Sequence, residues 1–322
     1  MGLYYSPHPI KLNEIKESLI SLRRYASFKN MGGVIEKGNS KYPKVLKSIG
    51  DAPKQLYYKG NWDPEIFDRC LAVVGTRRMT GYGRHMTEQI VGEVAAAGVT
   101  IVSGFMYGID AEAHKAAVKA EGKTIAVMPC GIDVVYPEYQ ADLYQEILDT
   151  GGLIISEYED THPAISWTFP RRNRIVAGLS KATLVVEAGE DSGALITANL
   201  AKKYGRKVFA VPNPLTSAVS QGVTQLLKEG ATLVSSAQDI LQYYGLPKRD
   251  LGAPKSRLGK PRLEEVEGEL EQKIVEQLKK EAMEIDTLTR KLEIPAAQLG
   301  AAISMLQLKG HITKEQGKFH VI

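Results

Sequence analysis

The spacing of hydrophobic residues between positions 70 and 245 is typical of an α/β protein. Short, continuously apolar runs rich in β-branched residues alternate there with amphipathic stretches at helical spacing. The runs predict strands at 70–74, 99–103, 124–128, 153–156, 183–187, 207–211 and 231–234. The stretches between them predict helices near 84–97, 110–121, 138–149, 170–179, 193–204, 221–229 and 236–244. This alternation predicts a doubly wound, mostly parallel sheet with right-handed crossovers.

The segments on either side of this region follow different patterns. Apolar residues at helical spacing predict an amphipathic helix over residues 12–26 that docks elsewhere. Residues 30–69 carry scattered Gly and Pro and few periodic apolar positions, so we expect a lead-in segment that wraps the next domain. Residues 263–322 predict three helices and a terminal hairpin, which is the layout of a winged helix. The predicted domains are 1–69, 70–245, 246–262 (a basic linker containing three prolines) and 263–322.

Composition is that of an ordinary folded protein. Of the 322 residues, 43% are hydrophobic and 24% are charged, which permits a sizeable core and argues against global disorder. No apolar run reaches the ~18–20 residues of a membrane helix, and the start lacks the regions of a signal peptide. The two cysteines, Cys70 and Cys130, form no CxxC pair, and no residues have metal-ligand spacing. We expect a cytoplasmic protein without a membrane partner, a disulfide framework, a metal or a cofactor.

Glycine-containing turns follow four of the predicted strands, at the sheet edge where ligands bind in such folds. These turns include Gly75-Thr76-Arg77, Gly104, Gly131 and Ser192-Gly193. Backbone N–H groups in glycine turns approach anions closely, and the helix that follows directs its N-terminus toward them. No GxGxxG follows the first strand and GxxxxGK[ST] is absent, so neither a standard dinucleotide site nor a P-loop is expected. The turns predict a phosphate-binding edge of another kind.

Arginine is concentrated beside these turns. Arg77 directly follows a buried strand, in a turn aimed at the predicted ligand edge. A second group lies at the start of a predicted helix and consists of Arg171, Arg172, Asn173 and Arg174. Two of these arginines can clamp phosphates by bidentate donation. The alternative is a solvated helix end whose arginines pair with sheet-edge carboxylates such as Glu157 or Glu187.

Four aromatic residues flank the same turns. They are Phe105, Tyr107, Trp167 and Phe169. Each side chain can either stack on a nucleic-acid base or pack in the core or at its rim. The pattern alone does not separate these two roles.

Catalytic groups are sparse. His114 lies four residues after Asp110 on a predicted helix, a spacing at which the carboxylate can orient the ring. We expect this histidine to anchor its helix by a hydrogen bond rather than to act as a base. His162 precedes a proline in a loop and is expected to be exposed. No serine has an evident histidine–carboxylate relay, and Gly-x-Ser-x-Gly is absent, so the residues indicate binding without catalysis.

Taken in order, the motifs resemble the DNA-processing protein A (DprA/Smf) family over about residues 40–235. The resemblance is carried by Tyr42-Pro43, Val74-Gly75-Thr76-Arg77, Ser103-Gly104, Gly108-Ile109-Asp110, Gly131-Ile132-Asp133, Tyr136-Pro137, Ser156-Glu157, Phe169-Pro170, Arg172-Asn173-Arg174, Val186-Glu187-Ala188, Ser192-Gly193-Ala194 and Val211-Pro212. It implies an extended Rossmann-like domain that binds single-stranded DNA, forms a homodimer, protects incoming DNA and helps to load RecA recombinase in natural transformation, without turnover. Together with the turns above, the predicted DNA-binding residues are Gly75, Thr76, Arg77, Gly104, Phe169, Arg171, Arg172, Asn173, Arg174, Ser192 and Gly193.

Three turns depart from the family pattern. Tyr107 stands where Lys or Arg is common, so a phosphate contact is absent there or replaced by stacking or by the tyrosine hydroxyl. Asn213 follows Val211-Pro212 where glycine is usual, and asparagine tolerates left-handed backbone geometry better than most residues. A later Gly-x-Asn is here Gly222-Val-Thr224.

The net charge of +4 does not by itself indicate DNA binding. Residues 1–69 carry +5, residues 70–245 carry −3, the linker carries +5 and the tail carries −3. The domain predicted to bind DNA is therefore acidic, and the prediction depends on where its arginines lie. The third predicted tail helix, near 296–308, contains no charged residue. We therefore favour a protein-docking or structural role for the tail over DNA reading, promoter binding included.

The alternative function is that of a nucleotide-binding or nucleotide-hydrolysing Rossmann-like enzyme or sensor. The same sheet edge suits a small nucleotide as well as a strand. Such enzymes usually carry Pro-Gly-Gly-x-Gly-Thr with a nearby Glu, a motif that this sequence lacks.

Overall fold

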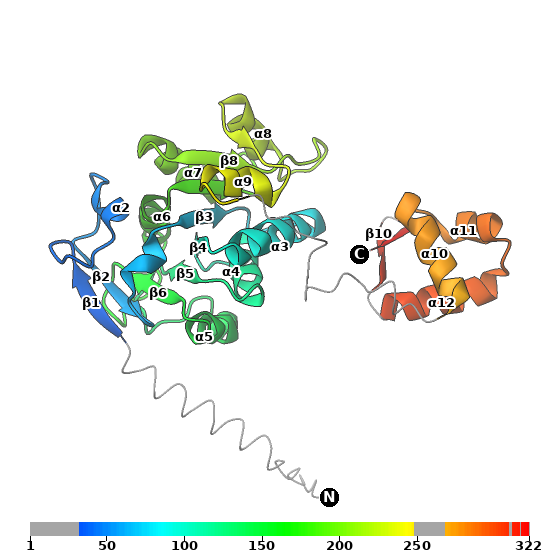
Figure 1. Cartoon of the computed structure of the whole chain (residues 1–322), viewed down its shortest axis with the longest axis horizontal. Helices are drawn as coiled ribbons and strands as arrows, with labels where there is room; N and C mark the ends of the chain where they lie inside the picture. The colour runs from blue at the N-terminus through cyan, green and yellow to red at the C-terminus, as the bar shows by residue number, and fades with distance from the viewer. Residues whose placement is uncertain (1–31, 248–267, 309–310, 316, 322) are drawn as a thin grey trace, which may run out of the picture. The chain divides into compact units, whose positions relative to one another are not determined.

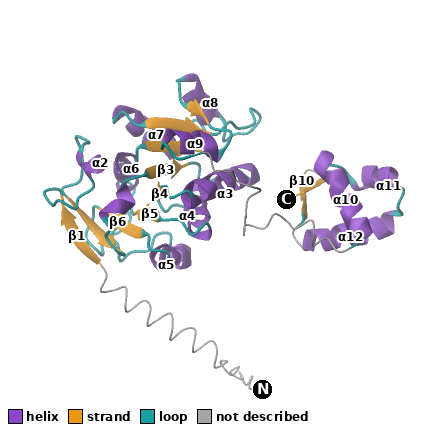
Figure 2. Cartoon of the chain, viewed as in Figure 1, coloured by secondary structure: helices purple, strands orange, loops and turns teal. Residues whose placement is uncertain are grey.

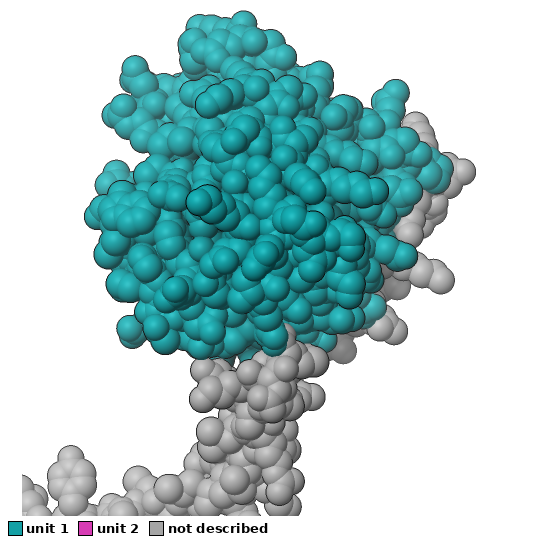
Figure 3. Space-filling model, turned by 90° about the vertical axis from the view of Figure 1, so that its left-hand side faces the viewer, with its two compact units in different colours: residues 1–248 teal, residues 249–322 magenta. Residues whose placement is uncertain are grey.

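The computed structural model describes residues 32–247, 268–308, 311–315 and 317–321. The helix expected over 12–26 and most of the expected linker lie outside these described residues. The chain divides into two compact units, residues 1–248 and 249–322, which we treat separately. Figure 1 labels the elements of both units, Figure 2 colours them by type, and Figure 3 shows one face of the first unit as a continuously packed body.

The first unit contains a nine-stranded sheet in the order β1-β2-β6-β5-β4-β3-β7-β8-β9 among the described residues. Its parallel strands are β3 (Cys70–Val74), β4 (Thr100–Ser103), β5 (Thr124–Val127), β6 (Leu153–Ser156), β7 (Ala182–Val185), β8 (Lys207–Ala210) and β9 (Thr232–Leu233). β3 to β7 are buried along their whole length, which explains why they read as continuous apolar runs. The predicted mostly parallel, doubly wound sheet is confirmed.

Helices cover both faces of this sheet (Figure 2). One face packs against α3 (Gly81–Ala96), α4 (Ile109–Lys119), α5 (Ala141–Asp149) and α9 (Ala237–Tyr243). The other packs against α6 (Thr168–Leu179), α7 (Gly193–Lys203) and α8 (Gln221–Lys228). All of these helices lie within a few residues of their predicted positions. Among the described residues, no helix combines the length and apolarity needed to cross a membrane.

The segment before β3 was predicted incompletely, because it adds two strands to the sheet. It contains β1 (Gly32–Glu36), α2 (Lys44–Lys47), β2 (Gln55–Lys59) and a 3₁₀ turn (Pro64–Phe67). β2 pairs antiparallel with β6, and β1 pairs antiparallel with β2. Each of these two strands has only one buried residue, Ile35 or Leu56, so neither shows the apolar run or clear alternation that marks a strand in a sequence.

The order of strands creates a switch point at β3. The chain builds β4, β5 and β6 outward on one side of β3, and then crosses through α6 to place β7 on its other side. At such a point the connections leaving two neighbouring strands diverge, and this is the edge at which open α/β sheets usually bind ligands. The turns after β3, β4 and β7 and the start of α6 therefore meet at one edge.

The second unit has the predicted winged-helix layout. It consists of α10 (Glu269–Lys280), α11 (Ile285–Leu292), α12 (Ala296–Leu308), β10 (Ile312–Glu315) and β11 (Lys318–Val321). The antiparallel hairpin of β10 and β11 is joined to the segment between α10 and α11 by a bridge between Met283 and Phe319. Its small core takes one face from each helix, including Ile274, Leu288 and Ile303.

Candidate nucleic-acid interface

The turn after β3 holds Arg77 at the switch point. Its backbone is anchored on both sides, because the Thr76 N–H donates to the Glu187 carbonyl at 2.7 Å and the Thr76 carbonyl accepts from the Ile109 N–H at 3.2 Å. Gly75 is required by close packing, since a Cβ there would lie 2.5 Å from Cγ1 of Ile109. These contacts make the turn a fixed support for the arginine side chain.

Arg77 lies among aromatic rings that come from three other segments. Its guanidinium carbon is 5.6 Å from the ring centroid of Tyr107, after β4, and 5.6 Å from that of Phe169, in the first turn of α6. Phe169 also makes an edge contact with Tyr136, from the loop after β5, with centroids 5.7 Å apart. Phe169 is half-buried and the other three side chains are exposed. We call Arg77, Tyr107, Tyr136 and Phe169 the Arg77 cluster.

Arg172 occupies a different environment, beneath the surface. The residue is 3% exposed, and its Nη1 donates to the carbonyl oxygens of Gly104 and Val127 at the ends of β4 and β5. A Cβ at position 104 would lie 2.5 Å from Nη2 of Arg172 and 2.6 Å from Oδ2 of Asp110, so only glycine leaves room for this packing. Burial lowers the pKa of Arg172 to about 10, which leaves the guanidinium charged at neutral pH. The side chain ties α6 to two central strands.

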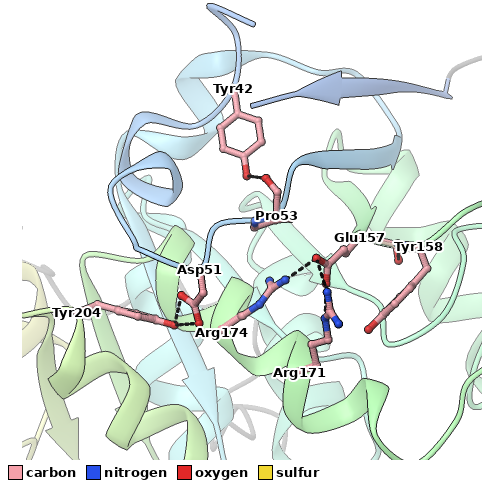
Figure 4. A network of polar contacts seen from close by, with 9 residues as sticks. Tyr42, Asp51, Pro53, Glu157, Tyr158, Arg171, Arg174 and Tyr204 are labelled. Atoms are coloured by element: carbon pink, nitrogen blue, oxygen red, sulfur yellow. Dashed lines mark hydrogen bonds and ion pairs between the residues drawn. The ribbon is translucent and has the colours of Figure 1, made fainter. Parts of the chain in front are cut away.

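The other two arginines of this helix share one carboxylate (Figure 4). Arg174 is largely buried, and its Nη2 lies 2.5 Å from Oε1 of Glu157. The Arg171 side chain is 52% exposed, and its Nε lies 3.2 Å from Oε2 of the same residue. Asn173 is half-buried, and its Oδ1 accepts from Nε of Arg172 at 3.2 Å. Within the described residues, Arg171 is thus the member of the group whose cation faces solvent.

Of the four flanking aromatic residues, Tyr107 and Phe169 belong to the Arg77 cluster, whereas Phe105 and Trp167 lie outside it. Phe105 is fully buried and belongs to the core cluster beneath α5, so it packs and does not stack on a ligand. Trp167 is 50% exposed at the start of α6. His162 is partly exposed, and its ring also stacks on Tyr158 with centroids 4.5 Å apart.

Two helix starts at this edge are occupied differently. The N-terminus of α3 receives a carboxylate from the protein itself, since Glu187 accepts from the Thr80 N–H at 3.0 Å and from its hydroxyl at 2.5 Å. Glu187 is 1% exposed and abuts Gly83, where any side chain would overlap it. At α7, Ser192 caps the helix by accepting from the Ala194 N–H at 3.3 Å, and Gly193 beside it is exposed. An external anion is therefore excluded at α3 and sterically allowed at α7.

His114 anchors its helix, but Asp110 is not its partner. Its Nδ1 lies 2.7 Å from the hydroxyl of Thr124, which itself donates to the Ile101 carbonyl at 2.9 Å, so Nδ1 carries the proton. Burial, with a contribution from the charge of Arg172, lowers the pKa of His114 to about 3. Burial raises the pKa of Asp110, and the charge of Arg172 opposes the shift. A histidine that stays neutral and fully enclosed has no access to a substrate.

Asn213 supports its turn through its side chain rather than through left-handed geometry. Its Nδ2 donates to the Val186 carbonyl at 2.7 Å and to the Val211 carbonyl at 2.8 Å, and its φ is not positive. The turn after β8 is therefore pinned to the end of β7. These side-chain hydrogen bonds hold the turn in a conformation that does not require a left-handed residue at position 213.

Sequence reasoning missed Tyr136 as a member of the site. It lies in an irregular loop, nine residues after the end of β5, and only tertiary packing brings it to Phe169. The available signal was the Tyr136-Pro137 pair, which is one of the motifs that carry the family resemblance. Among the described residues, no group of three or more His, Cys, Asp or Glu side chains is arranged to hold a metal ion.

Fold and site together define an extended Rossmann-like protein with an arginine–aromatic surface at its switch point and a winged helix at its C-terminal end. The sequence matches the model of DNA recombination-mediator protein A over residues 33–245 and that of the DprA winged helix domain over residues 259–318. The chain belongs to the DNA recombination-mediator protein A family, which makes it a DNA-processing protein.

Curated relatives agree with this assignment. Protein Smf of Escherichia coli (strain K12) is 41% identical over 201 residues, which are 62% of this chain and 54% of that protein. DNA processing protein DprA of Bacillus subtilis (strain 168) is 37% identical over 241 residues, which are 74% of this chain and 80% of that protein. The match thus spans about half of the E. coli relative and most of the B. subtilis one.

Two solved structures share the fold. The X-ray structure of DNA processing protein A from Streptococcus pneumoniae has a TM-score of 0.62 at 37% identity, covering 71% of this chain and 80% of that one. DNA processing protein A from Helicobacter pylori has a TM-score of 0.59 at 34% identity, covering 66% and 95%. The latter structure concerns the unique single-stranded DNA binding mode of that protein.

Proposed function

We propose that this chain binds single-stranded DNA at the Arg77 cluster and acts as a recombination mediator. The observation that carries the proposal is the convergence of an exposed arginine with three aromatic rings at the switch point. Unpaired bases can stack on such rings whatever their sequence, while the arginine neutralises a phosphate. The single-stranded DNA binding of the H. pylori protein, which has the same fold, supports this assignment.

The predicted site residues divide into contacts and supports. We propose that Arg77, Phe169 and Arg171 contact the strand, because their side chains are at least partly exposed. The exposed start of α7, at Ser192 and Gly193, offers backbone N–H groups to a further phosphate. The remaining predicted residues hold the site in shape, by close packing or by buried hydrogen bonds; they are Gly75, Thr76, Gly104, Arg172, Asn173 and Arg174.

The test of this site is a salt titration of oligo(dT) binding with Arg77→Ala. Arg69→Ala serves as the matched control, since Arg69 is exposed at the amino end of β3, the opposite edge of the sheet. Loss of one phosphate contact should lower the slope of log K against log salt by about 0.7 in magnitude, and should weaken binding at each fixed salt concentration. An Arg77→Ala protein with unchanged affinity and slope would contradict the site assignment.

We propose further that the chain works by binding and has no turnover. Glu187 is engaged by Thr80, and His114 is enclosed with a pKa near 3, so neither is placed to act as a general base at this edge. Incubation with nucleoside monophosphates and with NAD, followed by chromatography, tests this point. Specific conversion of either compound would favour the enzyme alternative.

The proposed partners are RecA recombinase and a second copy of this chain, in the cytoplasm. Leu233 is an exposed apolar residue on β9, a strand at the edge of the sheet, and such a residue on an edge strand favours a homodimer contact. Light scattering with and without oligo(dT) measures the oligomeric state, and Leu233→Lys should shift it to the monomer. A mediator should also increase the RecA bound to single-stranded DNA at limiting RecA, and Arg77→Ala should abolish that increase.

For the second unit we propose a docking or structural role. The exposed side chains of α12 are uncharged and include Gln298, Ser304, Met305 and Gln307. A helix that reads duplex DNA needs donors to bases and phosphates along its exposed face. These residues supply few, and none of them carries a positive charge.

A further inference from the structure

We infer that Trp167 is a second base-stacking position beside the Arg77 cluster, and that it serves a neighbouring nucleotide of the same strand. The inference rests on the proposed single-stranded DNA binding and extends it to residues outside the family motifs. Trp167 lies at the start of α6 with half of its surface exposed. Such exposure is unusual for a tryptophan, because burial of the indole is normally strongly favourable.

The indole is held in place by neighbours on the protein side. Its ring makes edge contacts with Tyr158, at a centroid distance of 5.9 Å, and with His162, at 6.4 Å. Tyr158 and His162 stack on each other, so the two rings form one support. The ring is therefore restrained before any ligand arrives, which reduces the entropy cost of stacking a base on it.

A cation accompanies this ring, as it does in the Arg77 cluster. The guanidinium carbon of Arg171 is 5.7 Å from the Trp167 centroid, and the same guanidinium forms an ion pair with Glu157. The combination of a ring and an arginine occurs twice at this edge, with Arg77 beside Phe169 and Arg171 beside Trp167. Each pair offers a π-face for a base and a positive charge for a phosphate.

The two pairs are close enough to act on one strand. Trp167 and Phe169 are two residues apart, so their Cα atoms lie within about 7 Å of each other. Stacking on a protein ring requires a base that is not already stacked inside a duplex, so a second such position adds to the preference for single strands. An exposed tryptophan beside an arginine is also typical of protein-binding surfaces, and the experiment separates the two ligands.

The experiment uses tryptophan fluorescence in the full chain, which contains two tryptophans. Trp62 packs between Tyr58 and Phe67 beside β2, so Trp62→Phe leaves Trp167 as the single reporter with the Arg77 cluster intact. Titration with oligo(dT) should quench the Trp167 emission over the same concentrations at which the anisotropy of a labelled oligonucleotide rises. Trp167→Ala should weaken binding about 5- to 150-fold, while Trp167→Phe, which keeps a ring, should retain most of the affinity.

Three outcomes distinguish the possibilities. Normal DNA binding with unquenched Trp167 emission and an unaltered Trp167→Ala affinity would overturn this inference and leave the proposed function standing; the surface would then suit a protein partner. Absence of DNA binding by the unaltered chain would overturn both. If Trp167→Ala fails to fold, the quenching measured in the Trp62→Phe protein still decides the question.

Discussion

Replacement of Arg172 by alanine distinguishes a support from a DNA contact. The substitution removes the charged group that donates hydrogen bonds to the carbonyl oxygens of Gly104 and Val127. Both buried acceptors lose this donor. It also leaves Asp110 without its nearest opposing charge. Hydrogen bonds to charged groups are each worth about 1.5–3 kcal/mol, and removing one partner from a buried charged network costs about 3–5 kcal/mol. Replacement of an exposed arginine would instead change the free energy of unfolding by no more than about 0.5 kcal/mol.

The expected result is therefore a large loss of stability. For a unit of this size, about 3–5 kcal/mol corresponds to a fall in Tm of roughly 6–20 °C, at about 2–4 °C per kcal/mol. Urea unfolding followed by circular dichroism measures the free energy directly, and oligo(dT) affinity is measured at a temperature where the variant is folded. Arg77→Ala should show the opposite pattern, with stability close to that of the unaltered protein and weakened DNA binding. An Arg172→Ala protein of unchanged Tm that no longer binds DNA would refute the supporting role.

Three further predictions concern other parts of the chain. His114 has a pKa near 3 in the folded protein and about 6.5 in the unfolded chain, so between these pH values only the unfolded chain binds the extra proton. The free energy of unfolding should therefore fall by about 1.4 kcal/mol per pH unit as the pH drops from 6.5 to 3. His114→Gln should flatten this pH dependence in urea unfolding, and an identical slope would disprove the assignment. Gly83→Ala should destabilise the first unit by about 1–3 kcal/mol in the same assay, since its methyl group would overlap the Glu187 carboxylate at the start of α3; unchanged stability would show that this contact is not required. Removal of residues 249–322 should leave the affinities for oligo(dT) and for duplex DNA unchanged in a mobility-shift titration. If the truncated protein lost duplex binding alone, the second unit would have a DNA-reading role.

Much of the fold follows from local patterns in the sequence. The strands from β3 to β8 are buried from both faces, so their apolar runs are visible without any knowledge of the tertiary structure. The helices between them and the faces of the winged helix carry equally regular spacing. β1 and β2 lack this signal, because each has only one buried residue. They are held in the sheet by backbone pairing, β2 to β6 and β1 to β2, which the sequence does not display.

The sequence by itself determined which residue types gather at the ligand edge: glycine turns, arginines and aromatic rings in the segments that leave the strands. The tertiary structure decided which of them face solvent. Arg171, Arg172 and Arg174 lie within four residues, yet the rotation of about 100° per residue along α6 sends one to the surface and two into the protein. Likewise Tyr107 and Tyr136, 29 residues apart, meet Phe169 and Arg77 only because β3, β4, β5 and α6 converge at the switch point. Which side chains are exposed, and which of them meet, depends on packing between segments that are distant in the sequence. The local spacing of residues therefore does not predict either property.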